Sequence, residues 1–169
     1  MNREQTITEL DSLLLLHRGL LNESEQNDFS RLLLEAREMP DVDEEGNESP
    51  LPIELVRLGK ILQLRCYDQS SDVLSFSLNG VSMWLNPQQR VNYLMTIDAA
   101  EENGRTAVPF GGAEIPISYA RTVLNAVALY AMQTMAVTDA HAAAIRALQT
   151  IAEIDAYDFT VGYPERLVF

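Results

Sequence analysis

The feature that most constrains how this chain folds is a hairpin-and-helix pattern that occurs twice between Val73 and Ala136. In each copy two short apolar runs flank a two-residue turn, which is Asn79-Gly80 in the first copy and Gly111-Gly112 in the second. A tight hairpin turn of type I′ needs positive φ at both central residues, and Asn and Gly adopt it most readily. A helical run follows each hairpin directly, over Pro87–Asn103 and Tyr119–Ala136. The pattern therefore predicts two β-hairpins that each lead into a helix.

Capping residues mark where these two helices begin and end. Asn86 fits the N-cap of the first helix, Pro87 its first position, and Gln89 the return partner of a capping box. Gly104 follows the first helix as its C-terminal stop. Ser118 is the expected N-cap of the second helix.

Two prolines limit what the strands can build. Pro109 and Pro116 lie one on each strand of the second hairpin, and proline cannot donate a hydrogen bond to a neighbouring strand. We therefore expect the second hairpin to lie at an edge or to be short. The four short strands predict a small antiparallel or mixed sheet with helices on one face. Together with the long helical runs, this predicts an α+β fold that is mainly helical.

A pair of helices is expected before this core. Apolar side chains recur at helical spacing over residues 6–39, with an interruption by polar capping residues at Asn22-Glu23-Ser24. Thr6 or Thr8 is the expected N-cap of the first helix. Pro40 ends the second helix, because proline disfavours helical geometry in the residue before it. The sequence thus predicts an N-terminal αα-hairpin.

The residues that follow this pair suggest the domain boundaries. Residues 40–51 are acidic and rich in turn-forming residues, so they are the predicted linker between a helical hairpin at 1–39 and an α+β core domain at 52–169. From Asp41 onward the linker matches the first positions of a calcium-binding EF-hand loop. That loop needs a bidentate Glu at its twelfth position, where this chain has Pro52. We therefore expect no metal site here.

The C-terminal part is predicted to form a further helix and an ordered tail. A break at Ala136-Val137 and a restart at Thr138-Asp139 separate this helix from the one before it. His141 lies near the expected start, where a buried, hydrogen-bonded role and a ligand or proton-transfer role are the alternatives. The tail from Tyr157 to Phe169 is rich in aromatic side chains, which predicts that it docks. The sequence leaves open whether it docks on its own chain or on another subunit.

Five aromatic residues are the candidate protein–protein contacts. Trp84 lies in a hairpin strand, where core packing and an interface anchor are the alternatives. The other four, Tyr157, Phe159, Tyr163 and Phe169, lie in the tail. An apolar group of this kind is typical of a contact surface and equally of a tail packed on its own domain.

The composition argues against several classes of function. A net charge of −13 and a pI of about 4.4 disfavour direct nucleic-acid binding and docking on an anionic membrane. The acidity fits ordinary solubility, with mimicry of DNA charge as the alternative. No apolar run has the length of a membrane span, and the N-terminus lacks the layout of a secretion signal. A single cysteine, Cys66, suits a reducing compartment.

Catalytic motifs are missing from the sequence. His17 and His141 lie outside any recognisable nucleophile motif, and the usual zinc-binding and phosphate-binding motifs are absent. Cys66 has only Arg65 as a basic neighbour, so an inert thiol is expected. Lys60 is the only lysine, which leaves little material for a Schiff base or a phosphate clamp. We therefore expect a protein that is not an enzyme and uses no cofactor.

The second half of the chain resembles a known family. The features that carry the resemblance are Trp84-Leu85, Arg90, the hairpin from Phe110 to Ile117, the Ala-rich helix, Thr138 to His141, Ala144 to Leu148, Tyr157 to Thr160, and Gly162-Tyr163-Pro164. They are similar to a domain of unknown function found in bacteriophage tail and tail-fibre-associated proteins and in related prophage proteins. The resemblance covers roughly residues 80–169, whereas residues 1–70 have no counterpart in it. It implies a phage particle, a tail-associated position and a structural or assembly role.

These observations lead to one expected function and two alternatives. The expected function is that of a non-enzymatic phage virion or tail accessory protein that works by protein–protein contacts, in multiple copies, located in the virion or in the host cytoplasm during assembly. Its partners would be other virion or tail proteins and further copies of itself in a symmetric array. The first alternative is a tail or tail-fibre assembly chaperone that is absent from the mature particle. The second is an acidic inhibitor that mimics DNA.

Overall fold

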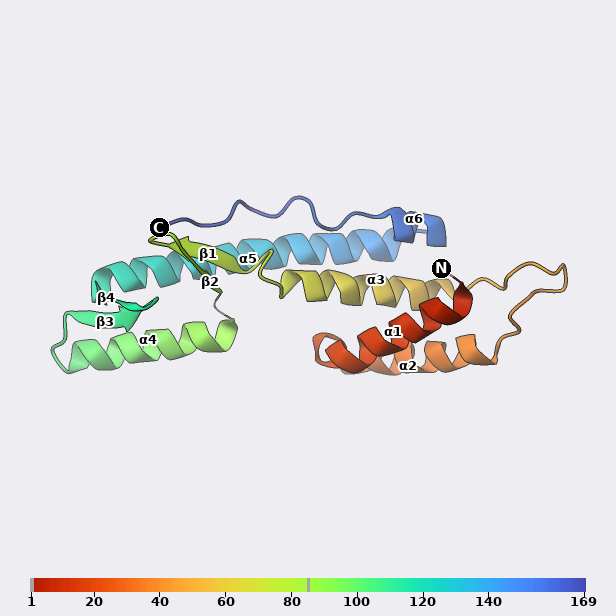
Figure 1. Cartoon of the computed structure of the whole chain (residues 1–169), viewed down its shortest axis with the longest axis horizontal. Coiled ribbons are helices and arrows are strands. Elements are labelled where there is room, and N and C mark those ends of the chain that lie inside the picture. The colour runs from red at the N-terminus through yellow and green to blue at the C-terminus, as the bar shows by residue number, and fades with distance from the viewer. Residues whose placement is uncertain (1, 85) are drawn as a thin grey trace. The chain divides into compact units, whose positions relative to one another are not determined.

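The computed structural model describes residues 2–84 and 86–169, and its architecture is the predicted α+β fold, mainly helical (Figure 1). The helices are α1 (Arg3–His17), α2 (Glu23–Glu38), α3 (Ile53–Asp68), α4 (Pro87–Glu102), α5 (Ile117–Ala147) and α6 (Ile151–Ala156), with a 3₁₀ turn, η1, at Arg18–Leu20. The strands are β1 (Ser75–Leu78), β2 (Val81–Trp84), β3 (Ala107–Phe110) and β4 (Ala113–Pro116).

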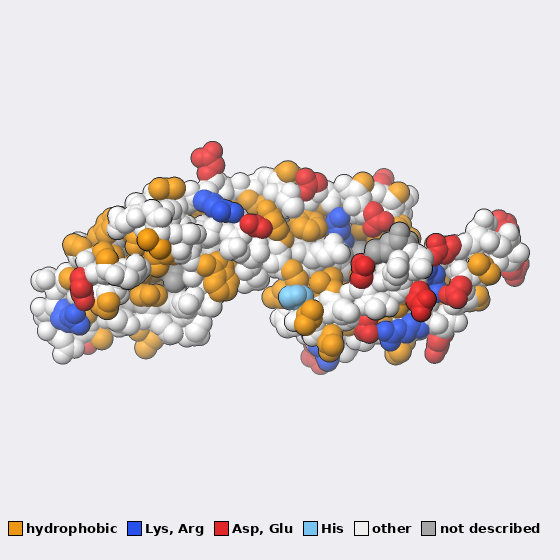
Figure 2. All heavy atoms as spheres, viewed as in Figure 1, with side chains coloured by type: hydrophobic (Ala, Val, Ile, Leu, Met, Phe, Trp, Pro, Cys, Tyr) orange, Lys and Arg blue, Asp and Glu red, His pale blue; other side chains and the backbone are white. Residues whose placement is uncertain are grey.

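The chain divides into two compact units, which we name by their contents. The helical unit comprises Met1–Cys66 and Thr138–Val161, and the hairpin unit comprises Tyr67–Val137 and Gly162–Phe169. Charge is divided unequally between them. The helical unit has 18 acidic and 8 basic side chains, a net charge of −10, whereas the hairpin unit has 7 and 4, a net charge of −3. Figure 2 shows acidic side chains crowded on one face of the helical unit and more hydrophobic side chains on the hairpin unit.

Asparagine capping boxes start both N-terminal helices. Asn2 caps α1 and Asn22 caps α2, and in each case the backbone N–H of the cap residue donates in return to the side chain three residues later. The prediction that Thr6 or Thr8 caps α1 is therefore wrong. Both threonines lie inside the helix, where each hydroxyl donates to the carbonyl four residues earlier. The predicted αα-hairpin is present, and α2 ends at Glu38, two residues before the proline.

The core of the helical unit lies between α1, α2 and α3. Apolar side chains at helical spacing fill it: Ile7, Leu10 and Leu14 from α1, Phe29, Leu33 and Ala36 from α2, and Leu55 and Leu62 from α3. A smaller cluster joins α3 to α5 through Ile61, Leu64, Ala142 and Ile145. Residues 40–51, the predicted linker, are part of this unit. Arg3 holds this loop to α1, with Nη1 3.1 Å from Asp41 Oδ1 and its backbone N–H donating to Glu48.

Helix α5 is continuous, so the predicted break at Ala136-Val137 is wrong. No Gly or Pro occurs between Ile117 and Ala147, and the Ala-rich run has high helix propensity. The helix also begins one residue before the predicted cap Ser118, because the backbone N–H of Ile117 donates to the carbonyl of Thr106 in the preceding hairpin. A separate short helix, α6, starts only after the N-cap Thr150.

Both predicted hairpins form as expected. Positive φ occurs at Asn79 and Gly80 in the first turn and at Gly111 and Gly112 in the second, as type I′ turns require. Of the two sheet alternatives, the pairing is antiparallel, and each hairpin is a separate two-stranded sheet. Leu85, assigned by the sequence to the end of the first hairpin, lies outside the described residues.

The helix after the first hairpin has the predicted ends. Asn86 caps α4, and its capping box with Gln89 and the proline at the first position are all present. Gly104 has φ of 70°. The N–H groups of Gly104 and Arg105 donate back to the carbonyls of Glu101 and Ala100, which closes the helix with a Schellman motif.

The C-terminal tail docks on its own chain, which answers the question left open by the sequence. Ser77 exchanges backbone hydrogen bonds with Leu167 and Phe169, and Ser77 and Val168 form a parallel bridge. The tail therefore covers the edge of β1 that β2 leaves open (Figure 1). The aromatic ring of Phe169 also packs edge-on against Phe76, with ring centroids 6.0 Å apart. The prediction that the tail docks is confirmed.

Candidate binding groove

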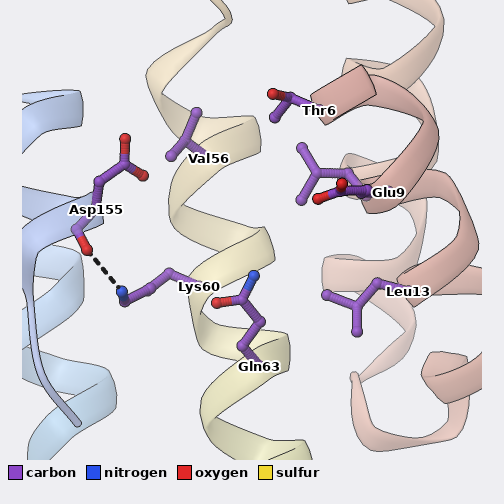
Figure 3. A pocket seen from close by; sticks show the side chains of 8 residues that line it. Thr6, Glu9, Leu13, Val56, Lys60, Gln63 and Asp155 are labelled. Carbon is purple, nitrogen blue, oxygen red and sulfur yellow. Dashed lines mark hydrogen bonds between the residues drawn. The ribbon is translucent and has the colours of Figure 1, made fainter. Parts of the chain in front are cut away.

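A groove follows one face of α3 in the helical unit. Val56, Lys60 and Gln63 occur at positions i, i+4 and i+7, so helical periodicity places their side chains in one row. Figure 3 shows this row between α1, which carries Glu9, and α6, which carries Asp155. The face of α3 that is not used by the core thus becomes the floor of an open channel.

The groove consists of two adjoining cavities of about 410 and 290 Å³. Both are bordered by Thr6, Val56 and Asp155, which join them along α3. Their apolar lining consists of Leu10, Leu13, Val56, Leu51, Pro50 and Ile151. Their volumes are in the range of small ligand sites, but a channel that stays open along a helix suits a polypeptide segment better than an enclosed small molecule.

A glycine brings α1 close to α3 beside this channel. Gly59 is buried, and a side-chain carbon added to it would collide with Leu10 Cδ2. The absence of a side chain at Gly59 therefore allows Leu10 to pack directly on the backbone of α3. This contact sets the distance between the two helices that form one side of the groove.

Three carboxylates line the groove, together with the cationic side chains of Arg3 and Lys60. Glu9 and Asp155 border the first cavity, and Glu48 and Asp155 the second. Lys60 lies between them, where its Nζ donates to the backbone carbonyl of Asp155 at 3.0 Å and is 5.4 Å from the ring centroid of Phe159. The lysine therefore contributes to holding the wall in place, and the groove offers a ligand apolar side chains beside the carboxylates of Glu9, Glu48 and Asp155.

A partly buried ion-pair network fixes the helices behind the groove. Glu25 on α2 accepts two hydrogen bonds from Arg65 on α3, at 2.6 and 3.0 Å, and one from Arg146 on α5 at 3.1 Å. Burial by itself would raise the pKa of the Glu25 carboxyl. The hydrogen bonds from Arg65 and from the backbone N–H of Asn22 outweigh burial and hold this pKa below its ordinary value. One carboxylate thus ties three helices together.

Two of the predicted contact residues are part of the helical unit. Tyr157 and Phe159 are half-buried and pack on the cluster between α3 and α5. His141 Nε2 is 2.8 Å from the carbonyl oxygen of Val161 and Nδ1 is 2.8 Å from the Tyr157 hydroxyl oxygen. Because a carbonyl can only accept, Nε2 donates, and in the tautomer with its proton on Nε2 the Tyr157 hydroxyl donates a hydrogen bond to Nδ1. His141 therefore anchors the tail. It lies within the continuous helix α5, whereas the sequence had placed it near the start of a separate helix.

The other three predicted contacts are part of the hairpin unit. Tyr163 is half-buried and packs edge-on against Tyr67, with ring centroids 5.6 Å apart, and Phe169 is half-buried on the hairpin core. Trp84 is exposed at the end of β2. Each of the four tail aromatics contacts its own chain, and the role of all five in binding another protein stays a prediction.

The groove was not among the sites predicted from the sequence. Lys60 drew attention only as the single lysine, and nothing singled out Glu9 or Asp155. The signal available in advance was the row of Val56, Lys60 and Gln63 on α3, which lies off the buried core face of the helix. That signal alone does not reveal which helices border the row, because Lys60 and Asp155 are 95 positions apart.

The groove lining combines apolar, hydroxyl, amide and charged side chains. Its residues include neither of the two histidines nor the cysteine, and burial raises the pKa of the Cys66 thiol, which disfavours the reactive thiolate. In the described residues, no group of three or more His, Cys, Asp or Glu side chains is arranged to hold a metal ion.

Within residues 2–84 and 86–169, no helix combines the length and hydropathy needed to cross a bilayer.

Comparison with known proteins adds no relative. No protein-family model matches the chain, and no curated protein or solved structure matches it significantly. The resemblance of residues 80–169 to the phage-tail family therefore stays a prediction. What the chain does has to be inferred from its own residues and their arrangement.

Proposed function

We propose that this protein is a non-enzymatic binding protein that holds a segment of another polypeptide in the groove along α3. The observation that carries the proposal is the combination, in one groove, of apolar side chains such as Leu13 and Val56 with the carboxylates of Glu9 and Asp155. An amphipathic helix or extended segment would bury its apolar side chains on the floor and place Lys or Arg side chains beside the walls.

The charge of the helical unit supports a basic partner. A net charge of −10 on this unit attracts a cationic segment at long range and repels acidic ones. Nucleic acid is disfavoured for the same reason, because its phosphates would have to approach carboxylates. The partner is therefore a polypeptide with apolar side chains flanked by basic ones.

The resemblance of residues 80–169 suggests the biological setting of this binding. On that basis we propose that the protein is an accessory component of a phage tail or virion, present in several copies, and that the groove binds another particle protein. Particle proteins commonly occupy symmetric arrays, in which a weak contact is repeated many times. An assembly chaperone is the alternative, since a groove that captures one exposed segment suits temporary holding equally well.

Groove binding can be tested with two synthetic amphipathic peptides of equal length, one of Leu and Lys and one of Leu and Glu. We expect the protein to bind the Leu/Lys peptide more tightly, measured by fluorescence anisotropy at low salt. The double variant Glu9→Lys, Asp155→Lys should weaken this binding by about tenfold, since each lost charge contact contributes up to about 1 kcal/mol. The matched control is Glu23→Lys, Glu38→Lys, which makes the same change in net charge at exposed positions of α2 outside the groove. Equal weakening by both double variants would show that net charge alone drives binding and would refute the groove.

The natural partner can be identified by photocrosslinking in cells that assemble the particle. A photoreactive amino acid at Gln63, exposed beside the floor, should give an adduct with one polypeptide, whereas the same group at Gln88 on α4 should not. Mass spectrometry of purified particles then separates the two settings, because an accessory component is retained and a chaperone is missing. If Gln63 gives no adduct beyond those seen at Gln88, the proposed function is wrong.

A further inference from the structure

A second surface of different character lies on α5 in the hairpin unit. Leu129, Met132 and Met135 occur at positions i, i+3 and i+6, and their side chains are 63%, 64% and 57% exposed. Ala128 and Ala136 are exposed beside them. We call these five residues the α5 face. Exposed apolar side chains that adjoin one another on a surface are a feature of interaction sites.

The α5 face contains no charge. Residues 122–138 include no Asp, Glu, Lys or Arg, although the chain as a whole has a net charge of −13. Two copies of an acidic protein repel each other wherever carboxylates face carboxylates. The α5 face is a surface through which two copies can approach without that repulsion, and depletion of charge is the property that distinguishes the centre of protein interfaces.

We infer that the α5 face binds the α5 face of a second copy, with the two helices antiparallel and a two-fold axis at Met132. A two-fold interface must be complementary to itself, and the order of side chains on the face satisfies this condition. With Met132 opposite the partner's Met132, Leu129 lies level with the partner's Met135. Ala128 lies level with the partner's Ala136, so small side chains meet on both sides of the centre and let the helices approach closely.

The character of the side chains also fits a contact between copies. Methionine side chains are flexible and polarizable, so Met132 and Met135 can adapt to a copy of themselves without a shaped pocket. Three turns of one helix bury less than the roughly 1,600 Å² of a standard stable interface. The dimer is therefore weak in dilute solution and strengthens where copies are held close together, as in an array. This supplies the self-contact for the proposed multi-copy function, but it uses a surface separate from the groove.

The inference is tested by charge substitution at the axis. Met132→Lys and Met132→Glu each place two like charges next to each other in the dimer, and each should raise the dimer dissociation constant at least tenfold in sedimentation equilibrium. A mixture of the two variants should recover dimers, because Lys then faces Glu. The control is Met95→Lys, a methionine on α4 with a similar exposure of 65%, which should leave the dissociation constant unchanged.

Each result decides the inference. Circular dichroism should show that all three variants fold, as expected for exposed positions. A wild-type chain that remains monomeric at millimolar concentration would overturn the α5 dimer, as would an equal effect of Met95→Lys. Disruption by both Met132 variants without recovery in the mixture would overturn the two-fold axis at this residue. Peptide binding in the groove is expected to be the same in these variants, so loss of the dimer and loss of the proposed function are distinguishable.

Discussion

Replacing Glu25 with Gln tests whether one carboxylate organises the helical unit. Its side chain is only 13% exposed, and it accepts hydrogen bonds from Arg65, from Arg146 and from the backbone N–H of Asn22. Gln has nearly the same size and remains a suitable partner in the capping box of α2. The substitution therefore removes the negative charge while it retains the local helix cap.

The size of the effect follows from these contacts. Hydrogen bonds between charged groups contribute about 1.5–3 kcal/mol each, but contributions within one network do not add. Arg146 is half exposed and contributes little, whereas Arg65 is 26% exposed and keeps a second acceptor, the Leu20 carbonyl, after the change. We therefore expect Glu25→Gln to lower the free energy of unfolding by about 2 kcal/mol.

The assay is urea unfolding at neutral pH followed by circular dichroism, with thermal unfolding alongside. A loss of about 2 kcal/mol corresponds to a fall in Tm of roughly 4–8 °C for a chain of this size. Glu35→Gln is the matched control, because Glu35 is on the same helix and pairs with Arg31 at a half-exposed position. The control should change stability by less than about 0.5 kcal/mol. Equal losses in the two variants would refute the network as a specific tie between helices.

The difference between wild type and Glu25→Gln should depend on pH. The pKa of Glu25 is lowered in the folded protein from its ordinary value of 4.5. The carboxylate therefore contributes stability above this value, and the contribution is lost as the pH falls through the folded pKa. The stability gap should be largest near neutral pH and should close as the pH falls through the folded pKa of Glu25. A gap of constant size across this range would contradict the assignment of the effect to charge.

Three further substitutions test individual contacts. Gly59→Val should lower the free energy of unfolding by about 2 kcal/mol, because the new side chain collides with Leu10. Gly19 has open space around it, so Gly19→Val should change this free energy, measured by urea unfolding, by less than about 1 kcal/mol. Asn86→Ala should lower the free energy of unfolding by about 1 kcal/mol by removing the cap of α4, whereas Asn86→Asp should keep both the cap and the stability. Tyr130→Phe should cost about 1–2 kcal/mol, since the buried hydroxyl donates to a backbone carbonyl at 2.7 Å. Burial also raises the pKa of Tyr130, so ultraviolet titration of the wild type should include a tyrosine ionisation at high pH that is missing from the Phe variant.

Features determined within a few residues could be predicted from the sequence. The turns at Asn79-Gly80 and Gly111-Gly112 and the cap at Asn86 depend on local backbone geometry, and all are present. The mainly helical α+β class followed from the same local signals. The cap of α1 was missed because Asn2 lies at the very start of the chain, where the threonines that follow offered equally good capping chemistry.

Features that depend on distant segments could not be predicted in this way. The expected break at Ala136-Val137 had no helix-breaking residue behind it, and α5 runs through it without interruption. The tail meets β1 through Ser77 and Val168, which are about ninety positions apart, and no local pattern indicates such a pairing. The groove has the same origin, since it exists only where α1 and α6 border α3.

The unequal charge of the two units leads to opposite salt responses at the two proposed surfaces. Binding of the Leu/Lys peptide beside Glu9 and Asp155 relies on attraction between exposed charges, which salt screens over about 8 Å at physiological ionic strength. Dimerisation through the α5 face involves no charge of residues 122–138 and proceeds against the general repulsion of two acidic chains, which salt also screens. Raising the salt concentration should therefore weaken peptide binding and strengthen the dimer. Two titrations of the same preparation, by anisotropy and by sedimentation, would measure both responses. A parallel loss of peptide binding and of dimers would mean that one acidic surface serves both contacts, and the separate α5 face would then be refuted.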